Sequence, residues 1–274
     1  MILPHQTSRG QRSSPGAGPS HVVILHGFLG TKRNWFSFAR ELAVRRPDAC
    51  ITCLDLPGHG DAAGSLLPSQ ASIRACAAEV CSTVQTLLGT GPVSLAGHSL
   101  GGKVALLAGL QLAEAGQLAG LWLLDSAPGS FPPASEAQAM LHALRATDHP
   151  FAQRQFAIAA LQDHGIAEPV AQWVATNLRR ETPDGPYRWP FDLAALEALL
   201  ADYLQLDAWE PLSQLARNVP VHLVRATRNS LLTGADVQRL ASMGLAVSVH
   251  TIDADHWVHI SGRSALLGLM SERL

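Results

Sequence analysis

A serine flanked by glycines is the clearest chemical pattern in the chain. Residues 97–101 read Gly-His-Ser-Leu-Gly, directly after the apolar run Val93–Ala96 and at the start of a helical pattern. A G-x-S-x-G turn between a strand and a helix holds its serine in a strained conformation, with the hydroxyl above the sheet. The flanking glycines are needed because a Cβ there would collide with neighbouring backbone. Ser99 is therefore the candidate nucleophile of an acyl-transfer reaction.

Such a nucleophile requires backbone amides that stabilise the oxyanion it generates. One is the N–H of Leu100, the residue after the nucleophile and the first of the helix. The second has to come from the loop after another strand, and residues 26–30, His-Gly-Phe-Leu-Gly, follow the apolar run Val22–Leu25. We expect the N–H of Phe28 to be this second donor, with His26 and Gly27 supporting the loop.

The general base is expected late in the chain. Residues 255–259, Asp-His-Trp-Val-His, follow the last apolar run, Val247–Ile252. We favour His256 because it comes first in the loop after that run, whereas His259 would begin the closing helix. His98, inside the glycine-flanked turn, is interpreted as packing beside the nucleophile. No histidines and carboxylates have the spacing of a metal site, so we expect neither a metal nor a cofactor.

The carboxylate that orients the histidine is the least settled member of the set. In the usual order it follows the strand before that of the histidine, which is Val221–Val224 here. The loop there contains no carboxylate before Asp236 and has Asn229 at the expected position. An amide orients an imidazole but carries no charge to stabilise an imidazolium. Asp125 ends the apolar run Leu121–Leu124, which we expect beside the strand of the nucleophile, so it is our candidate acid.

Short apolar runs rich in Val, Ile and Leu set the positions of these residues. The runs are Val22–Leu25, Ile51–Leu54, Val93–Ala96, Leu121–Leu124, Val221–Val224 and Val247–Ile252. The helical patterns between them are Asn34–Arg45, Ser72–Leu88, Leu100–Ala115 and Asp236–Met243. Continuous apolar strands alternating with helices predict an α/β fold, a mainly parallel sheet with helices on both faces.

One interval, from Pro128 to about Asn218, interrupts the alternation with Ala- and Leu-rich helical patterns bounded by prolines. These patterns are Glu136–Thr147, Phe151–Asp163, Glu168–Arg180 and Leu193–Leu206. Because such an insert is too long for a loop, we expect a helical cap, residues 128–218, inserted between core segments 21–127 and 219–274. Its aromatic residues are either walls of an acyl site or the cap's own core: Phe151, Phe156, Trp173, Trp189 and Tyr203.

Composition excludes several classes of protein. The 274 residues include 20 Lys+Arg against 22 Asp+Glu, so the basic surface of a nucleic-acid binder is not expected. The chain has no apolar window of about 18 residues, and a membrane span is not expected. Only 15% of residues are charged; the apolar surface this implies is expected where the cap faces the serine. The four cysteines read as small buried hydrophobes in a reducing compartment.

Residues 1–20 are polar, contain Arg9 and Arg12, and have no acidic residue. We expect a flexible leader, with an organellar import segment as the alternative. A secretory signal is not expected because no apolar segment of the required length follows the start. The expected location is the cytoplasm, and the oligomeric state stays open.

Together the motifs HGFLG, DLPGHG, GHSLGG and DHWVH resemble the α/β-hydrolase superfamily over residues 20–274. The chain is most similar to the YbfF-type esterases and their mitochondrial abhydrolase relatives. The segments that carry this closer resemblance are Leu124–Pro128, Asn177–Leu178, Tyr187–Leu193 and Arg228–Ser230. The resemblance implies a serine esterase whose acid stands at the position of Asp125, with a serine at the position of Ser230 assisting the histidine.

The chain departs from that family in two places. The family usually opens with a β-hairpin before the HG strand, and a short polar segment stands there instead, so we expect the sheet to lack one or two edge strands. The Gly-Gly pair common before Asn229-Ser230 is replaced by Ala226-Thr227-Arg228. This replacement weakens the case for Ser230 as a supporting residue.

The leading hypothesis is a serine carboxyl-ester hydrolase that acts on small-molecule acyl esters or thioesters through an acyl-enzyme. In this hypothesis Ser99 attacks, His256 transfers the proton and Asp125 fixes the tautomer, while the amides of Phe28 and Leu100 hold the oxyanion.

Two alternatives remain. LHGFLG and LDLPGHG also resemble the pyruvate-eliminating lyase of the menaquinone pathway, which ranks second because that enzyme needs a carboxylate where Asn229 stands. The other alternative is a catalytically silent protein with the hydrolase fold that binds a ligand, because fold does not determine function. The missing acid after Val221–Val224 favours it, and the serine, oxyanion and histidine motifs oppose it.

Overall fold

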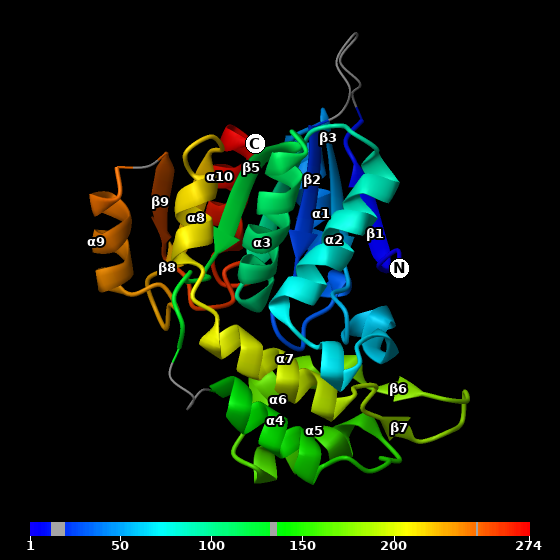
Figure 1. Ribbon diagram of the computed structural model, residues 1–274. Helices are drawn as coiled ribbons and strands as arrows, with labels where there is room; N and C mark the ends of the chain where they lie inside the picture. The colour runs from blue at the N-terminus through cyan, green and yellow to red at the C-terminus, as the bar shows by residue number, and fades with distance from the viewer. Residues whose placement is uncertain (12–19, 132–135, 245) are drawn as a thin grey trace.

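A computed structural model of the protein describes residues 1–11, 20–131, 136–244 and 246–274. Within them a seven-stranded sheet has the order β1-β3-β2-β4-β5-β8-β9 (Figure 1). The strands are β1 (His5–Arg9), β2 (Ser20–Leu25), β3 (Ala49–Leu54), β4 (Val93–His98), β5 (Leu118–Leu124), β8 (Val221–Ala226) and β9 (Val247–Ile252). Every neighbouring pair is parallel except β1–β3. The predicted mainly parallel sheet is therefore confirmed.

Strand β1 corrects the interpretation of the first residues. The expected flexible leader covered residues 1–20, but His5–Arg9 pairs antiparallel with β3, with Thr7 opposite Thr52. The side chains of β1 are polar because an edge strand is held by backbone hydrogen bonds and buries little, so no apolar run marks it. Leu3, fully buried, anchors the segment by donating its N–H to Thr83 Oγ1 at 3.0 Å. Residues 12–19 of the expected leader lie outside the described residues.

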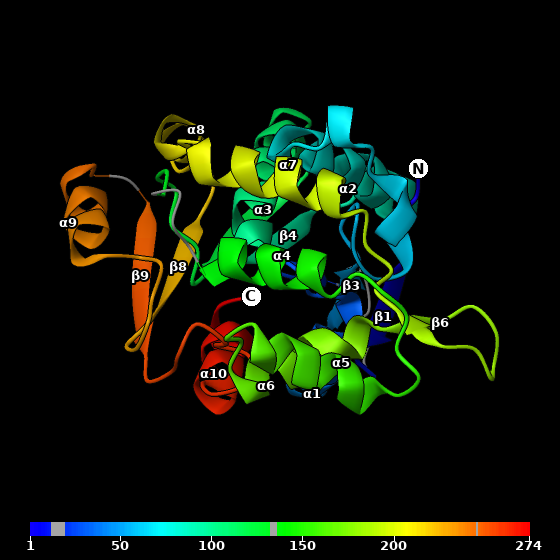
Figure 2. The same cartoon turned by 90° about the horizontal axis from the view of Figure 1, so that it is seen from below.

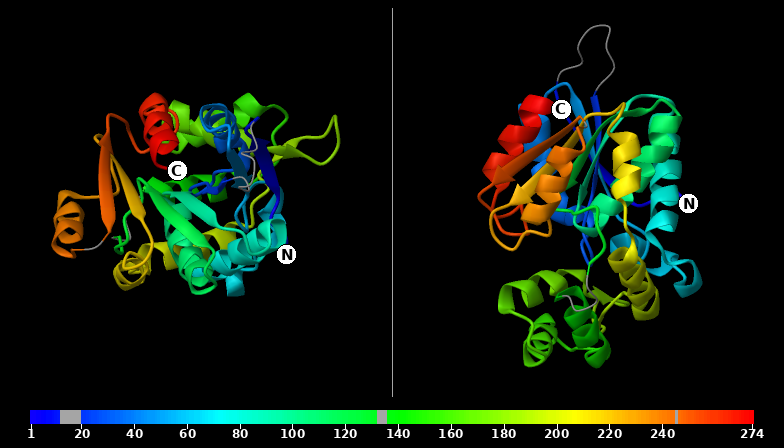
Figure 3. Two further views of the ribbon diagram at one scale, coloured as in Figure 1. Left: turned by 90° about the horizontal axis from the view of Figure 1, so that it is seen from above. Right: turned by 60° about the vertical axis from the view of Figure 1, so that its left-hand side comes forward.

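Helices cover both faces of the sheet, as Figures 1 and 3 show. One face carries α1 (Lys32–Arg45) and α10 (Arg263–Arg273), which pack against the side of the sheet that contains the Trp122 side chain. The other face carries α2 (Ile73–Leu88), α3 (Leu100–Glu114), α8 (Trp209–Leu215) and α9 (Gly234–Ser242). The short 3-10 helices η1 (Gly60–Ser65) and η2 (Pro68–Gln70) connect β3 to α2.

The interval after β5 forms a separate layer at the carboxyl ends of the strands, seen from below in Figure 2. It contains α4 (Glu136–Ala146), α5 (Arg154–Asp163), α6 (Glu168–Val174), η3 (Ala175–Asn177), β6 (Arg179–Arg180), β7 (Tyr187–Arg188) and α7 (Leu193–Gln205). The predicted helix Glu168–Arg180 is therefore wrong beyond residue 174. The chain turns there through η3 into β6, which pairs antiparallel with β7.

The cap returns to the core earlier than expected. The N–H of Ala208 donates to the carbonyl of Pro128 at 2.9 Å, so the chain leaves and re-enters the core at adjacent points. Helix α8 follows, and its Trp209 and Leu212 belong to the core cluster beneath α3. The predicted cap limit of residue 218 therefore included α8, which is a helix of the core.

The composition predicts buried cysteines and no membrane-spanning helix. All four cysteines are free and buried, as predicted. Among the helices of the described ranges none combines the length and the apolar character that crossing a membrane requires.

Candidate active site

Ser99 stands between β4 and α3 in the strained backbone that the motif requires. Its φ is 53° and its ψ −121°, a conformation that L residues rarely adopt. A Cβ on Gly97 would lie 2.1 Å from the carbonyl oxygen of Gly101, and one on Gly101 would lie 2.3 Å from the carbonyl oxygen of His26. Side chains are thus excluded at both glycines, and the loop after β2 packs directly on the turn.

In the described residues, the non-glycine residues with strained, positive-φ backbone cluster around this turn. The non-glycine residues with positive φ are Leu29, Ser99, Asp125 and Asn229. Each lies just after a different strand of the parallel sheet, β2, β4, β5 or β8. Strained backbone persists only where the surroundings hold it, and it clusters at functional sites. The carboxyl edge of the four central strands is therefore the candidate active site.

Asp125 and His256 are hydrogen-bonded across this edge. His256 Nδ1 lies 2.7 Å from Asp125 Oδ2. The carboxylate is fully buried and also accepts from Ser230 Oγ at 2.5 Å and from the N–H groups of Ala226 and Leu231 at 3.0 and 3.3 Å. Four donors thus surround the carboxylate, and its contact with Nδ1 places it to orient the imidazole of His256.

The other acids near the histidine, and the amide at the expected acid position, lie in different environments. Asn229 is exposed, whereas Asp236 accepts from the N–H of Thr233 in the capping box of α9. Asp255 accepts from the N–H of Trp257 at 2.8 Å. The structure thus brings Asp125, and not Asn229 or Asp236, to His256.

The remaining histidines of the turn and the loop are buried. His98 Nε2 donates to the carbonyl of His256 at 2.8 Å, which ties the histidine loop to the serine turn. Burial, together with neighbouring His256, lowers the pKa of His98 well below its ordinary value, so its ring is neutral. His259 stacks on Trp35 at 4.2 Å, and burial lowers its pKa to about 3. Both rings pack beside the site.

His26 orients the peptide expected to supply the second oxyanion donor. The N–H of Leu56 donates to His26 Nε2 at 3.0 Å, so the ring proton sits on Nδ1 and is donated to the carbonyl of Gly27 at 2.8 Å. The N–H of Gly30 donates to the same carbonyl at 3.0 Å. Because the carbonyl and N–H of a trans peptide point in opposite directions, the N–H of Phe28 points away from these donors.

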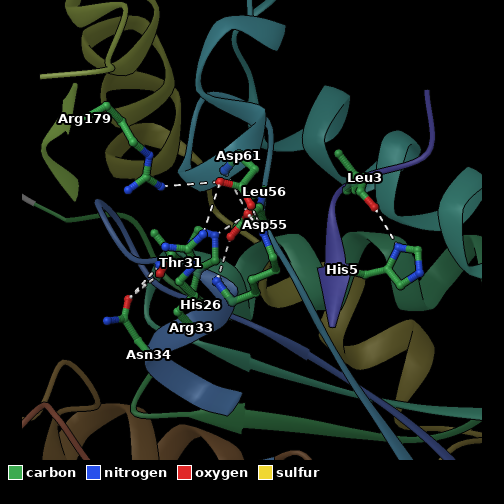
Figure 4. A network of polar contacts seen from close by, with 11 residues as sticks. Leu3, His5, His26, Thr31, Arg33, Asn34, Asp55, Leu56, Asp61 and Arg179 are labelled. Atoms are coloured by element: carbon green, nitrogen blue, oxygen red, sulfur yellow. Dashed lines mark hydrogen bonds and ion pairs between the residues drawn. The ribbon is translucent and has the colours of Figure 1, made fainter. Parts of the chain in front are cut away.

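A buried ion network holds the base of this loop, as Figure 4 shows. Asp55, at the end of β3 and fully buried, accepts from the N–H of Lys32 at 2.7 Å and from its Nζ at 2.5 Å. Lys32 Nζ also donates to Asp61 Oδ2 at 2.5 Å. Gly60 has φ 54°, and a Cβ there would lie 2.3 Å from Asp55 Cγ. The network therefore joins the start of α1 to the turn formed by residues 55–60, DLPGHG.

Replacing Lys32 with methionine should lower the free energy of unfolding by about 3–5 kcal/mol, because it leaves the buried carboxylate of Asp55 without its counter-charge. Arg33→Met is the matched control: Arg33 is 64% exposed and lies 3.8 Å from Asp61, so its loss should cost no more than about 0.5 kcal/mol. Urea unfolding measures both. Equal stability of the two variants would show that the Lys32–Asp55 pair contributes little.

Three of the contacts between the cap and the core involve the oxyanion loop, the turn after β3 and the histidine loop. Asn177 Nδ2 donates to the carbonyl of Leu29 in the oxyanion loop at 3.0 Å. Arg179 pairs with Asp61 at 3.4 Å, as Figure 4 shows. Trp173 meets Trp257 edge to face at 4.3 Å between ring centroids, beside the histidine. The resemblance drew attention to Asn177, but its bond to Leu29 depends on how the cap is placed, which periodicity does not reveal.

The cap aromatics lie in three different surroundings. Phe151 and Trp189 are buried in the cap's own core with ring centroids 6.1 Å apart, and Phe156 is half exposed on α5. Trp173 and Tyr203 lie at the boundary with the serine core, Trp173 against Trp257 and Tyr203 within the core cluster.

In the described residues no group of three or more His, Cys, Asp or Glu is arranged to hold a metal ion.

Several known proteins are similar to this chain in sequence. The chain is 26% identical to sn-1-specific diacylglycerol lipase ABHD11 of Mus musculus, across 87% of this chain and 75% of that protein. It is 29% identical to Lipase LipV of Mycobacterium tuberculosis, across 96% of both chains. It is also 36% identical to 2-succinyl-6-hydroxy-2,4-cyclohexadiene-1-carboxylate synthase of Citrobacter koseri, across 40% of this chain and 39% of that protein.

The fold matches solved structures across almost the whole chain. A structure described as a marine microorganism esterase has a TM-score of 0.80 with 21% identity, and the match covers 99% of both chains. The sequence model described as the alpha/beta hydrolase family matches residues 22–267, which include the serine turn, the cap and the histidine loop. The chain therefore belongs to the alpha/beta hydrolase family.

Proposed function

We propose that the protein is a serine carboxyl-ester hydrolase that forms an acyl-enzyme with Ser99. The observation that carries the proposal is the 2.7 Å bond between His256 and Asp125, next to a strained serine at a helix N-terminus. Acyl transfer requires a nucleophile, a base and an acid that orients the base, and Ser99, His256 and Asp125 would take these roles. The lipase names of two relatives that align over most of the chain support the same reaction.

The reaction would proceed in two halves. His256 Nε2 removes the proton of Ser99 while Oγ bonds to the acyl carbon, and the electron pair of the carbonyl moves onto its oxygen. The N–H groups of Phe28 and Leu100 hold that oxygen. The imidazolium protonates the leaving alcohol or thiol, and water then repeats the sequence to release the acid. Asp125 stabilises the imidazolium in both halves.

Aromatic side chains beside the histidine favour an acyl chain or a small aromatic group over a polar substrate. Trp173 from the cap and Trp257 from the core meet there, and the ring of Phe28 lies 6.0 Å from His59 on the opposite loop. Carboxyl esters and thioesters are both compatible with this site. The pyruvate-eliminating reaction is the second candidate because of the partial similarity to the Citrobacter koseri synthase.

A substrate panel tests the proposal. We expect the protein to hydrolyse p-nitrophenyl esters from acetate to laurate and the matching acyl thioesters, and to react with a fluorophosphonate probe, which labels only an activated serine. A pyruvate-elimination assay should be run beside the panel. Pyruvate release without ester hydrolysis would establish the lyase instead. Neither activity, with no labelling, would establish the catalytically silent binding protein.

A further inference from the structure

A buried lysine of the core fastens the end of a cap helix. Lys103 lies in the first turn of α3, four residues after Ser99, and is 1% exposed. Its Nζ donates to the carbonyl of Tyr203 at 2.9 Å and to that of Leu206 at 2.7 Å. These carbonyls stand at the carboxyl end of α7, where the last C=O groups of a helix have no N–H donors within the helix and carry partial negative charge. An ammonium group is therefore a favourable cap for this helix end.

The same ammonium also holds the side chain of Tyr203. Lys103 Nζ lies 4.7 Å from the ring centroid of Tyr203 and 4.8 Å from that of Phe131, and the two rings are 5.4 Å apart. A desolvated cation over two aromatic faces is a strong restraint on their orientation. Lys103 thus fixes both the backbone and the ring of Tyr203. Figure 1 shows α7 lying between the sheet core and the rest of the cap.

The hydroxyl of Tyr203 is buried at the active site. The residue is 5% exposed, and its hydroxyl oxygen has no hydrogen-bond partner of ordinary geometry within the described part of the chain. Burial raises the pKa of this phenol, the Ser99 side chain opposes the rise, and the charge of Asp125 adds to it. The phenol therefore stays protonated. The ring of Tyr203 lies against Lys103, which stands one helical turn after Ser99 in α3, so the phenol is placed near the serine turn. Buried polar groups without partners are rare and costly, which indicates a partner that arrives with the substrate.

We propose that Tyr203 is a further substrate-contacting residue, whose hydroxyl donates a hydrogen bond to an oxygen on the reacting acyl carbon, and that Lys103 is the positioning residue that holds it there. The inference rests on the proposed esterase reaction. It adds a donor supplied by the cap to the two amides of the core. The closure of α7 onto α3 then belongs to the catalytic arrangement itself.

Tyr203→Phe tests the first half. The variant keeps the ring and its contact with Lys103, so it should melt at the wild-type temperature, while kcat for p-nitrophenyl butyrate falls roughly tenfold to a hundredfold. Tyr187→Phe, in β7 with its ring over Arg180, is the matched control and should keep the wild-type kcat. Wild-type kcat in Tyr203→Phe would overturn the inference. A wild-type protein that the fluorophosphonate probe does not label would instead overturn the proposed esterase reaction.

Lys103→Met tests the second half. We expect the variant to lose kcat by the same factor as Tyr203→Phe, and the double variant to be little worse than either, because both remove one positioned hydroxyl. Losses that multiply in the double variant would show that Lys103 acts independently of Tyr203 and would overturn its positioning role.

The pH profile gives a readout that a purely structural lysine would not change. Burial lowers the pKa of Lys103 to about 8, opposed by the charges of Asp207 and Asp202. Above that pH the ammonium is lost, so wild-type kcat should decline through pH 8 to 9. The decline should be absent from Lys103→Met, which has no charge to lose. An identical decline in both proteins would contradict the assignment.

Discussion

Replacing Ser99 with alanine should abolish ester hydrolysis, lowering kcat by about 10⁵-fold to 10⁶-fold. The reason is that the bond to the acyl carbon can form only at Oγ, and what remains is catalysis by the oxyanion donors and by substrate binding. The substitution removes a single atom. Its hydroxyl makes no capping bond to α3, and the alanine Cβ occupies the same place in the strained turn. The free energy of unfolding should therefore change by no more than about 0.5 kcal/mol.

The measurement is kcat with p-nitrophenyl butyrate together with fluorophosphonate labelling and a urea melt. Ser94→Ala, at the amino end of the strand that precedes Ser99, is the matched control and should keep activity and labelling. Hydrolysis that survives in Ser99→Ala, with the wild-type fold intact, would remove Ser99 from the reaction. The whole mechanism proposed above would fall with it.

The central sheet could be predicted because its strands are buried on both faces. Runs such as Val22–Leu25 and Leu121–Leu124 carry that pattern without help from the rest of the fold. Strand β1, with the sequence HQTSR, could not be predicted, since an edge strand depends on backbone pairing with β3. The end of α6 was missed for a related reason. The hairpin β6–β7 interrupts a sequence that continues to read as helix.

The candidate site could be predicted to the extent that its residues follow strands. Ser99, Asp125 and His256 each come directly after a strand or in the next loop, and parallel strands bring these loops to one edge. Tyr203 and Lys103 lie in helices, where a tyrosine or lysine at core spacing is indistinguishable from ordinary packing. Only the placement of α7 on α3 reveals their relation.

The low charge of the chain goes together with three buried apolar clusters. We expected an exposed apolar surface where the cap faces Ser99, but the apolar side chains of the described residues form three buried clusters, two on the faces of the sheet and one inside the cap. The exposed large apolar side chains lie on separate elements: Met1, Ile2, Val44, Leu67, Leu87, Phe156 and Ile260. Ser99 itself is 8% exposed. A third apolar core therefore contributes to the low charge of the chain, and the apolar surface facing Ser99 stays a prediction.

Asp125→Asn should lower kcat about 10⁴-fold while KM changes little, because the effect falls on the imidazolium of the transition state. Asp125 Oδ2 accepts from His256 Nδ1 at 2.7 Å. An amide NH₂ group at that position favours the wrong tautomer, and the carbonyl orientation lacks the charge. Ser230 and Ala226 also donate to Oδ1, so either orientation of the amide leaves buried donors facing each other. Stability should fall as well, by about 1–3 kcal/mol.

Two other variants separate Asp125 from the acid positions that sequence order would favour. Asn229→Gly keeps the positive φ of 50° that the position requires, and Asp236→Asn keeps an acceptor for the capping box of α9. Both should retain kcat within about twofold, since neither side chain reaches His256. If either variant loses more kcat than Asp125→Asn, the acid is misassigned. Equal loss in all three would indicate that the loop after β8, and not one carboxylate, holds the histidine.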